Sequence, residues 1–491
     1  MGDPATVFEK FVTPGSGQAP GASHLNDLYH TGLAQVVPDQ GLIPRLAETV
    51  PSLENGGWTV APDGPMETVW TIRTGAAWHD GAPFTTADLL FSATLEQDPD
   101  LPIDKDFVFD QIERIEALDA RIVRVHWARP FVFADTLFTT QRGIPLPRHI
   151  LERPYVEDRA RFAEWPYWRE EFIGTGPFKI RDWTRGSHLL LEANDRYILG
   201  RPKLDLIEVK FIQDANAVVA NVLAGIVELT IGASMTLEQN LDVADQWGGG
   251  RVDIWFNNVV SAWPQLLNPS PAVVADARFR RALLYATDRQ SMVDPLLHGR
   301  SEVADSLVNP KYPEHREIAS SIVHYAYDPR KAAEIIETLG YRRESDGFFR
   351  DAAGQRLTVE VRGSTVTEIG RKTSYPVADN WQRAGVAVDL VFPPPQRSRD
   401  REYRATFPGF EMARGANEFE GLRRFHSANN AVPENDFTGT NRTRYFNREF
   451  DALIDSFYVT IPRPQRIEIL GRTEGRHIFQ ATLSRAKGDT A

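Results

Sequence analysis

A histidine stands directly beside an aspartate in the stretch WHDGAPFTTADLLFS, which runs from Trp78 to Ser92. An imidazole next to a carboxylate could exchange a proton near neutral pH or help to hold a metal or phosphate. The threonines and acids that follow the His79–Asp80 pair are also typical of a corner at which a strand becomes a helix. The stretch therefore has two interpretations, a reactive site or a structural turn.

Helix capping accounts for most of this stretch. Thr85 is expected to be a helix N-cap, and Asp88 is placed to reach back to the Thr85 amide in a short-armed capping box. Phe84 and Leu89 have the spacing of a hydrophobic staple, and Gly81 fits a turn. Every polar residue except His79 then has a structural role. We expect His79 to end a strand, and we predict no active site here.

Other reactive patterns are scarce. The chain has no Walker loop, dinucleotide fingerprint, H-E-x-x-H or G-x-S-x-G motif. The closest two of its eleven histidines, His24 and His30, are six residues apart, which does not bring both to one helix face. Adjacent acids such as Glu170 and Glu171 arise by chance among 67 acidic residues. We predict no catalytic residue, no cofactor and no metal site.

Aromatic residues in polar settings are the remaining candidates for ligand contact. The chain has eleven tryptophans, some in stretches such as EWPYWREE (164–171) and DIWFNN (253–258). Aromatic side chains give an organic ligand a large contact area when they line a cleft. The alternative interpretation is packing in the core.

Bulk composition excludes several classes of partner. A formal net charge of -12 argues against nucleic acid and anionic membranes, which need a clustered basic surface. The absence of cysteine excludes disulfides and thiolate chemistry. No window approaches the ~18 apolar residues of a membrane span. The composition is that of a soluble globular protein with two or three structural units.

Local patterns predict a mixed architecture. Alternating strands are expected at 67–74, 121–127 and 189–193, so the first two hundred residues are β-rich. Residues 203–212, 214–225 and 227–232 are expected to form a strand, a helix and a strand, which favours parallel pairing.

A second mixed region follows residue 275. Asp276, Asp288 and Asp328 are expected to cap three helices, with Pro329 in the first turn of the third. The stretch 357–392 has a second strand–helix–strand pattern. Two such units, about 150 residues apart along the chain, predict two α/β lobes.

Five segments carry a family resemblance. They are GLIPRLAETV (41–50), WTIRTGAAWHDGAPFTTADLLFS (70–92), the stretch from FIGTGPFKI to AGIVEL (172–229), DARFRRALLYATDRQSMVDPLLHG (276–299) and YDPRKAAEIIETLGY (327–341). In this order they resemble family 5 extracellular solute-binding proteins, the peptide- and nickel-binding receptors of ABC importers. The resemblance covers roughly Gly41 to Leu470.

The resemblance implies a two-lobed α/β fold like that of type II periplasmic binding proteins, with a β-rich subdomain inserted in the first lobe. We expect the first lobe at 1–255 with the insertion at about 50–170, the second lobe at 256–434, and a return to the first lobe at 435–491. A solute would be enclosed between the lobes when they close.

The function implied is a receptor that captures a peptide or other small organic solute and delivers it to ABC permease subunits. The protein is expected to be a monomer without catalytic activity, in the periplasm or attached to the outer face of the cytoplasmic membrane. The export signal is expected to be absent from this chain. Nucleic acid is not an expected partner.

The ligand contacts are expected on three segments. They are Gly15 and Gly17 in the loop 15–21, Trp255, Asn257 and Asn258 near the first crossing, and Glu411, Arg414 and Asn417 in the second lobe. Peptide binders of the family carry an Asp in a D-Y-x-D-P-like segment that pairs with the ligand amino terminus. The corresponding region here, 407–422, lacks it and offers Arg414, which is expected to pair with a ligand carboxylate.

Two alternatives remain open. One is a small-peptide or ester hydrolase with an unrecognised acid/His site, which would show turnover that depends on one histidine. The other is a regulatory protein that senses solute without transporting it.

Overall fold

The computed structural model describes residues 2–12, 19, 21–37, 41–61, 64–232, 234–253, 258–364, 368–397, 400–416, 419–474 and 482–486. The chain forms two compact units. Unit 1 consists of Met1–Asp253, Tyr458–Ile461 and Asp489–Ala491, and unit 2 consists of Ile254–Phe457 and Pro462–Gly488. In this division most of the segment 435–491 belongs to unit 2. The lobe boundaries expected from the family resemblance stay a prediction.

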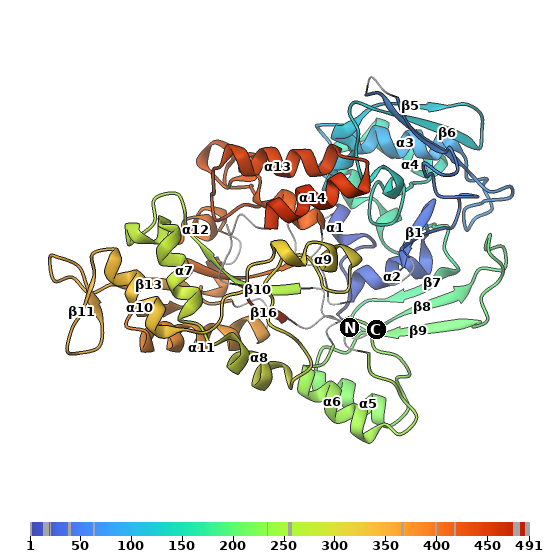
Figure 1. Ribbon diagram of the computed structural model, residues 1–491. Coiled ribbons are helices and arrows are strands. Elements are labelled where there is room, and N and C mark those ends of the chain that lie inside the picture. Colours follow the sequence, from blue (N-terminus) through green and yellow to red (C-terminus); the bar gives the residue numbers. More distant parts are fainter. Residues whose placement is uncertain are drawn as a thin grey trace. The chain divides into compact units, whose positions relative to one another are not determined.

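Unit 1 is built around antiparallel sheets (Figure 1). A hairpin pairs β1 (Ala34–Val37) with β2 (Gly41–Pro44). A four-stranded sheet has the order β3 (Trp58–Val60), β4 (Met66–Thr71), β6 (Ile122–Trp127), β5 (Ile112–Ala117). A three-stranded sheet consists of β7 (Phe178–Thr184), β8 (His188–Ala193) and β9 (Leu206–Lys210). The three predicted alternating strands are thus confirmed as β4, β6 and β8.

Four helices of unit 1 contribute to an aromatic core: α1 (Glu9–Val12), α2 (Ala22–Tyr29), α3 (Thr86–Gln97) and α4 (Arg148–Glu157). Two others, α5 (Ala215–Leu223) and α6 (Leu237–Gln246), share a separate small apolar cluster. Tyr167 and Trp168, in the polar stretch 164–171, are fully buried in the aromatic core. The core-packing interpretation therefore holds for these two aromatics. The acidic residues around them in the sequence are exposed on the surface.

The first predicted strand–helix–strand unit is only partly confirmed. β9 and α5 form, but none of residues 227–232, which the structure describes, belongs to a strand. Val227 packs instead against the small apolar cluster between α5 and α6, while Leu229 is 68% exposed. β9 pairs antiparallel with β8, so the predicted parallel pairing is wrong here. Alternation can predict an extended segment, but a strand also needs a neighbouring strand edge.

Unit 2 contains a five-stranded sheet of order β14-β13-β15-β10-β16. The strands are β14 (Ala387–Val391), β13 (Thr358–Arg362), β15 (Phe410–Ala416), β10 (Asn258–Pro264) and β16 (Thr482–Ala486). β13 pairs in parallel with β14, and α11 (Glu368–Arg383) connects them. The second predicted strand–helix–strand unit is confirmed.

The predicted helix caps of unit 2 are confirmed. Asp276 caps α7 (Ala277–Tyr285), Asp288 caps α8 (Arg289–Leu297) and Asp328 caps α10 (Pro329–Thr338), each by accepting a backbone N–H from the first turn. Helices α7, α10 and α11 contribute to a large apolar core against one face of the sheet. Four further helices are α9 (Pro313–Glu317), α12 (Arg401–Ala405), α13 (Arg448–Val459) and α14 (Arg463–Glu474), and β11 (Arg342–Arg343) pairs with β12 (Phe349–Arg350).

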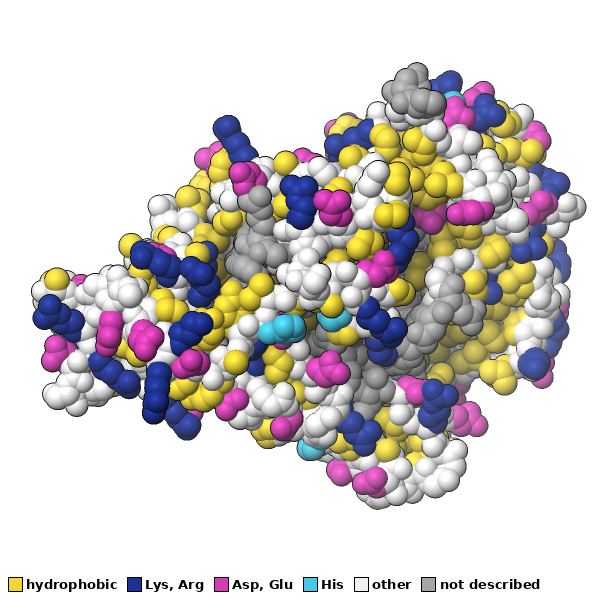
Figure 2. Space-filling view, in the orientation of Figure 1, with side chains coloured by type: hydrophobic (Ala, Val, Ile, Leu, Met, Phe, Trp, Pro, Cys, Tyr) yellow, Lys and Arg dark blue, Asp and Glu magenta, His cyan; other side chains and the backbone are white. Residues whose placement is uncertain are grey.

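No helix in the described part of the chain is long and apolar enough to cross a membrane. Basic and acidic side chains are interspersed over the face shown in Figure 2.

The capping box predicted at Thr85 and Asp88 is present at the start of α3, with the Asp88 carboxylate 2.9 Å from the Thr85 amide. The expectation that His79 ends a strand is wrong, because β4 ends at Thr71 and His79 lies in a turn. His79 has another structural role, which no sequence pattern indicated. Its Nδ1 accepts from the Gly174 amide at 3.1 Å and its Nε2 lies 3.0 Å from the Gly176 carbonyl. A neutral imidazole protonated on Nε2 satisfies both contacts, so His79 holds the loop before β7.

Burial keeps His79 and its neighbour His30 neutral. The pKa of His79 is lowered to about 4, mainly by burial. The pKa of His30, which stacks on Trp78, is lowered to about 3 by burial and by His79. Unfolded histidine takes up a proton near pH 6.5. Below that pH the unfolded chain binds more protons than the folded one, so stability falls as the pH falls towards 4.

We therefore expect unit 1 to be acid-sensitive because of His79. Between pH 7 and pH 5 its titration alone should lower the free energy of unfolding by about 2 kcal/mol. The variant His79→Gln retains one acceptor and one donor but does not titrate. Its free energy of unfolding should therefore fall by about 2 kcal/mol less than that of the wild type between pH 7 and pH 5. Urea unfolding at the two pH values measures this, with His24→Gln at an exposed position as the control. Equal losses for wild type and His79→Gln would contradict the assignment.

Candidate ligand-binding surfaces on unit 2

The two neighbouring strands β10 and β15 carry three of the predicted ligand contacts. They pair antiparallel over their full length, from Asn258 opposite Ala416 to Pro264 opposite Phe410. Side chains directly opposite each other across such a pair point to the same face, and successive side chains alternate between faces. The register therefore fixes which predicted residues can act together.

Glu411 and Arg414 lie on opposite faces of this sheet. They are three residues apart on β15, an odd spacing that reverses the direction of the side chain. Arg414 lies an even number of positions from Phe410 and Met412, so its side chain points to the same face of the strand as theirs. Phe410 and Met412 are buried in the core shared with α7, α10 and α11. Glu411 points to the opposite face, to which positions 413 and 415 are also directed. The two side chains cannot contribute to one surface of the sheet.

Arg414 and Asn258 share a face at one end of the strand pair. Arg414 stands opposite Val260, and Asn258 lies two residues before Val260 on β10. Such diagonal neighbours are within reach of a long side chain. Arg414 is exposed, and the described residues offer its guanidinium no hydrogen-bond acceptor. This end of the sheet presents a free cation beside an amide, which suits a carboxylate group.

Glu411 is already paired on the other face. Its carboxylate accepts from Nε of Arg442 at 2.8 Å, and the two side chains are 17% and 21% exposed. Trp263 stands directly opposite Glu411 on β10, and the Arg442 guanidinium lies 5.3 Å from its ring centre. Phe425 meets the same ring edge-on at 5.7 Å.

Two more arginines adjoin this pair. The Arg424 guanidinium lies 5.9 Å from the Trp263 ring centre. Burial lowers the pKa of Arg424, and the charge of Arg442 lowers it further. Burial and Arg442 also lower the pKa of Arg404, an effect that Glu411 opposes. Arg404 is more exposed than Arg424. The three arginines, Arg404, Arg424 and Arg442, outnumber the one carboxylate, that of Glu411.

The described residues contain no group of three or more His, Asp or Glu side chains that could hold a metal ion. His79 is engaged with the backbone through both ring nitrogens, so it is not available as a general base. Asp80 instead pairs with His149 at 2.8 Å on the surface. The pair that first suggested chemistry in the sequence is thus structural.

Sequence comparison identifies the family. Residues 42–432 match the family model described as "Bacterial extracellular solute-binding proteins, family 5 Middle". The chain belongs to this family. The oligopeptide-binding protein AppA of Bacillus subtilis is 25% identical over 333 residues, which cover 66% of this chain and 58% of AppA. The chain spans between 50% and 58% of the length of the first curated relatives that it matches.

Solved structures show that the chain has the two-lobed α/β fold of family 5. NikZ from Campylobacter jejuni, in complex with Ni(L-His), matches with a TM-score of 0.75 at 20% identity over 99% of this chain and 91% of NikZ. NikA from Brucella suis, in complex with Fe(III)-EDTA, matches with a TM-score of 0.76 at 18% identity over 100% of this chain and 94% of NikA. The expected fold class is confirmed.

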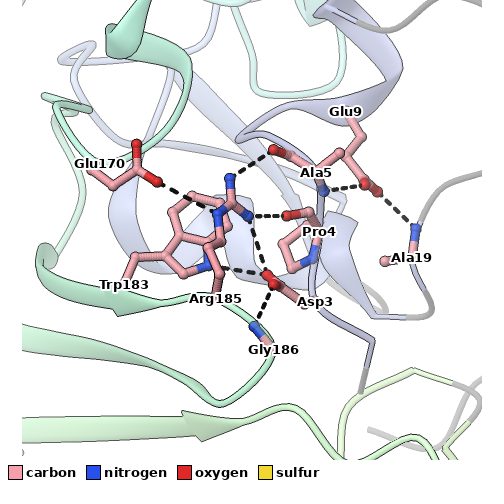
Figure 3. A network of polar contacts seen from close by, with 9 residues as sticks. All are labelled: Asp3, Pro4, Ala5, Glu9, Ala19, Glu170, Trp183, Arg185 and Gly186. Carbon is pink, nitrogen blue, oxygen red and sulfur yellow. Dashed lines mark hydrogen bonds and ion pairs between the residues drawn. The ribbon is translucent and has the colours of Figure 1, made fainter.

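Several predicted contacts of this family 5 protein lie outside the described residues: Gly15, Gly17, Trp255, Asn257 and Asn417. The chain on either side of the segment 13–18 is described. The Glu9 carboxylate accepts from the amides of Ala5 and Ala19, at 2.7 Å each (Figure 3). This side chain therefore ties Ala5, which precedes the predicted loop 15–21, to Ala19 within it.

The start of the chain is fixed further by Arg185. This arginine lies 3.9 Å above the ring of Trp183, pairs with Asp3 at 3.2 Å, and donates to the carbonyls of Pro4 and Ala5 (Figure 3). Asp3 also accepts from the Trp183 indole N–H at 3.0 Å. The predicted loop thus follows a firmly held segment of unit 1.

Sequence inspection missed Trp263, Arg424 and Arg442. Trp263 lies about 160 residues before Arg424, Arg442 follows 18 residues after Arg424, and no regular spacing links the three. The signal that was available is the alternation of β15, which separates Glu411 from Arg414 once a strand is assigned there.

The opposite orientation of Glu411 and Arg414 can be tested by double-mutant cycles on unit 2. Glu411→Gln and Arg442→Gln should couple by about 1–2 kcal/mol. Either substitution alone already breaks the charged hydrogen bond between the two side chains, so the double variant loses no more of it. Glu411→Gln and Arg414→Gln should add to within ~0.5 kcal/mol, because they lie on different faces. Urea unfolding measures both cycles. Strong coupling between Glu411 and Arg414 would contradict the assigned faces.

Proposed function

We propose that this family 5 protein is the solute-binding receptor of an ABC import system. It captures a small organic solute or a peptide and delivers it to permease subunits, with no catalytic step. It acts as a monomer in the periplasm or at the outer face of the cytoplasmic membrane. Family membership supports the receptor role, and the closing of a two-lobed receptor around its solute needs no reactive group.

The exposed Arg414 supports a solute with at least one carboxylate. Its guanidinium has no acceptor among the described residues, and Asn258 adds a neutral amide on the same face. The ligands named for the structural relatives are a nonapeptide, Ni(L-His) and Fe(III)-EDTA. Peptide termini, histidine and EDTA share the carboxylate group, which pairs with an arginine in a two-pronged hydrogen bond. Trp255, Asn257 and Asn417 adjoin these strand ends in the sequence and are proposed as further contacts, with Gly15 and Gly17 on unit 1.

A ligand screen tests the receptor role. Purified protein is mixed with peptide pools, amino acids, and histidine or EDTA chelates, and thermal unfolding is followed. A binding solute should raise the melting temperature in a concentration-dependent way. A folded sample that responds to none of these compounds would contradict the proposal. Turnover of a small ester or peptide, lost on changing one histidine, would favour the hydrolase alternative instead.

The contact with Arg414 has its own test. For a carboxylate solute found in the screen, Arg414→Gln should weaken binding about tenfold or more, because a charged hydrogen bond contributes roughly 1.5–3 kcal/mol. Amidation of the solute should weaken wild-type binding to a similar extent. Arg401→Gln, at an exposed position on α12, is the matched control. If calorimetry shows the same affinity for Arg414→Gln as for the wild type, the proposed contact with Arg414 is wrong. That result would not contradict the receptor role.

A further inference from the structure

The face of β10 and β15 opposite to Arg414 carries a cluster of its own, made of Trp263, Glu411, Arg424 and Arg442. The cluster contains two guanidinium groups and a single carboxylate. Glu411 accepts from Arg442 at 2.8 Å, and both guanidiniums lie within 6 Å of the centre of the Trp263 ring. The half-buried cluster thus has an excess of positive charge that no other described group neutralises.

Arg424 is the uncompensated member. It is half-buried, yet the described residues provide no hydrogen-bond acceptor and no ion-pair partner for its guanidinium. A ring face attracts a cation but leaves its five N–H donors without acceptors. A partly buried cation without an acceptor is costly, and more so beside a second cation.

The backbone beneath Arg424 leaves room for this arrangement. A Cβ atom on Gly415 would lie 3.1 Å from Nη1 of Arg424, so the guanidinium rests close to the bare backbone of β15. The guanidinium therefore lies close to Gly415 on β15 and within 6 Å of the Trp263 ring centre on β10. These neighbours restrict the side chain before any ligand arrives, which lowers the cost of binding.

We propose that Arg424 and Arg442 form a binding site for a small oxyanion, a carboxylate, phosphate or sulfate, on the face of β10 and β15 opposite to Arg414. Oxyanions match the planar fork of a guanidinium, and two forks that lie near the same tryptophan ring provide donors for one anion. Partial burial strengthens the attraction because less water screens it. The site does not depend on the proposed transport function.

Glu411 acts as a built-in competitor at this site. Its carboxylate occupies Arg442 in the structure, so an incoming anion meets one free guanidinium and one that is shared. Replacing Glu411 by glutamine removes the competing charge at nearly constant volume. Affinity for the oxyanion should then rise, an outcome that a purely structural arginine cluster would not produce.

The experiment measures anion binding to the full chain without any organic solute. Inorganic phosphate, sulfate and acetate are titrated by calorimetry against chloride at matched ionic strength. We expect wild type to bind at least one oxyanion, Arg424→Gln to bind about tenfold more weakly, and Glu411→Gln to bind more tightly. The order of the three anions distinguishes an organic carboxylate from an inorganic ligand.

The matched control is Arg330→Gln, an exposed arginine in the first turn of α10 that lies outside the cluster. It removes the same charge and should bind as wild type does. Equal responses to oxyanions and chloride in wild type, or unchanged affinity in folded Arg424→Gln, would overturn the proposal. If Arg424→Gln does not fold, Glu411→Gln decides, because unchanged or weaker binding there overturns it as well. In crystals soaked with selenate, anomalous scattering next to Arg424 would support the site, and its absence there would count against it.

Discussion

Seven residues of β10 pair with seven of β15, and this register fixes which polar groups of unit 2 can meet. One face of the pair is committed to the apolar core, in which Val260 and Met412 are buried together with residues of α7 and α11. A shift by one residue would turn these side chains to the other face, so the core holds the register strongly. Arg414 and Glu411 are directed to different faces by the same constraint.

The constraint also has a local cost. Ser261 must point to the face of Trp263, where its hydroxyl is buried and finds no partner among the described residues. The pairing of β10 with β16 shifts register beside it, between Val260 and Ser261. An unsatisfied buried hydroxyl costs ~1–3 kcal/mol, which is small compared with the apolar core that the register secures. Surface ion pairs, at ~0–1 kcal/mol each, could not enforce the same alignment.

Features that depend on neighbouring residues could be predicted from the sequence. Asp276 and Asp328 are recognisable as caps because the backbone amides that donate hydrogen bonds to them are only two or three residues away. The parallel pair β13 and β14 could be predicted because a single helix connects two apolar strands. The segment 227–232 was wrongly assigned because strand formation depends on an edge that the local pattern does not specify.

The role of His79 and the cluster around Trp263 lay beyond sequence inspection for the same reason. His79 needs the backbone of Gly174 and Gly176, more than ninety residues later in the chain. Arg424 and Arg442 reach Trp263 from segments about 160 and 180 residues away, and no spacing rule links them. The family resemblance could be read from five segments because these encode turns, caps and strands. Ligand contacts depend on which strand faces are left open.

The anchoring of the first residues by Arg185 has a consequence for the order of folding. Asp3 and Ala5 find their partners about 180 residues later in the chain. During synthesis on the ribosome, residues 3–5 must remain undocked until this arginine has emerged. Closing so long a loop is entropically expensive and slow. Residues 3–5 are therefore secured only well after they have been made.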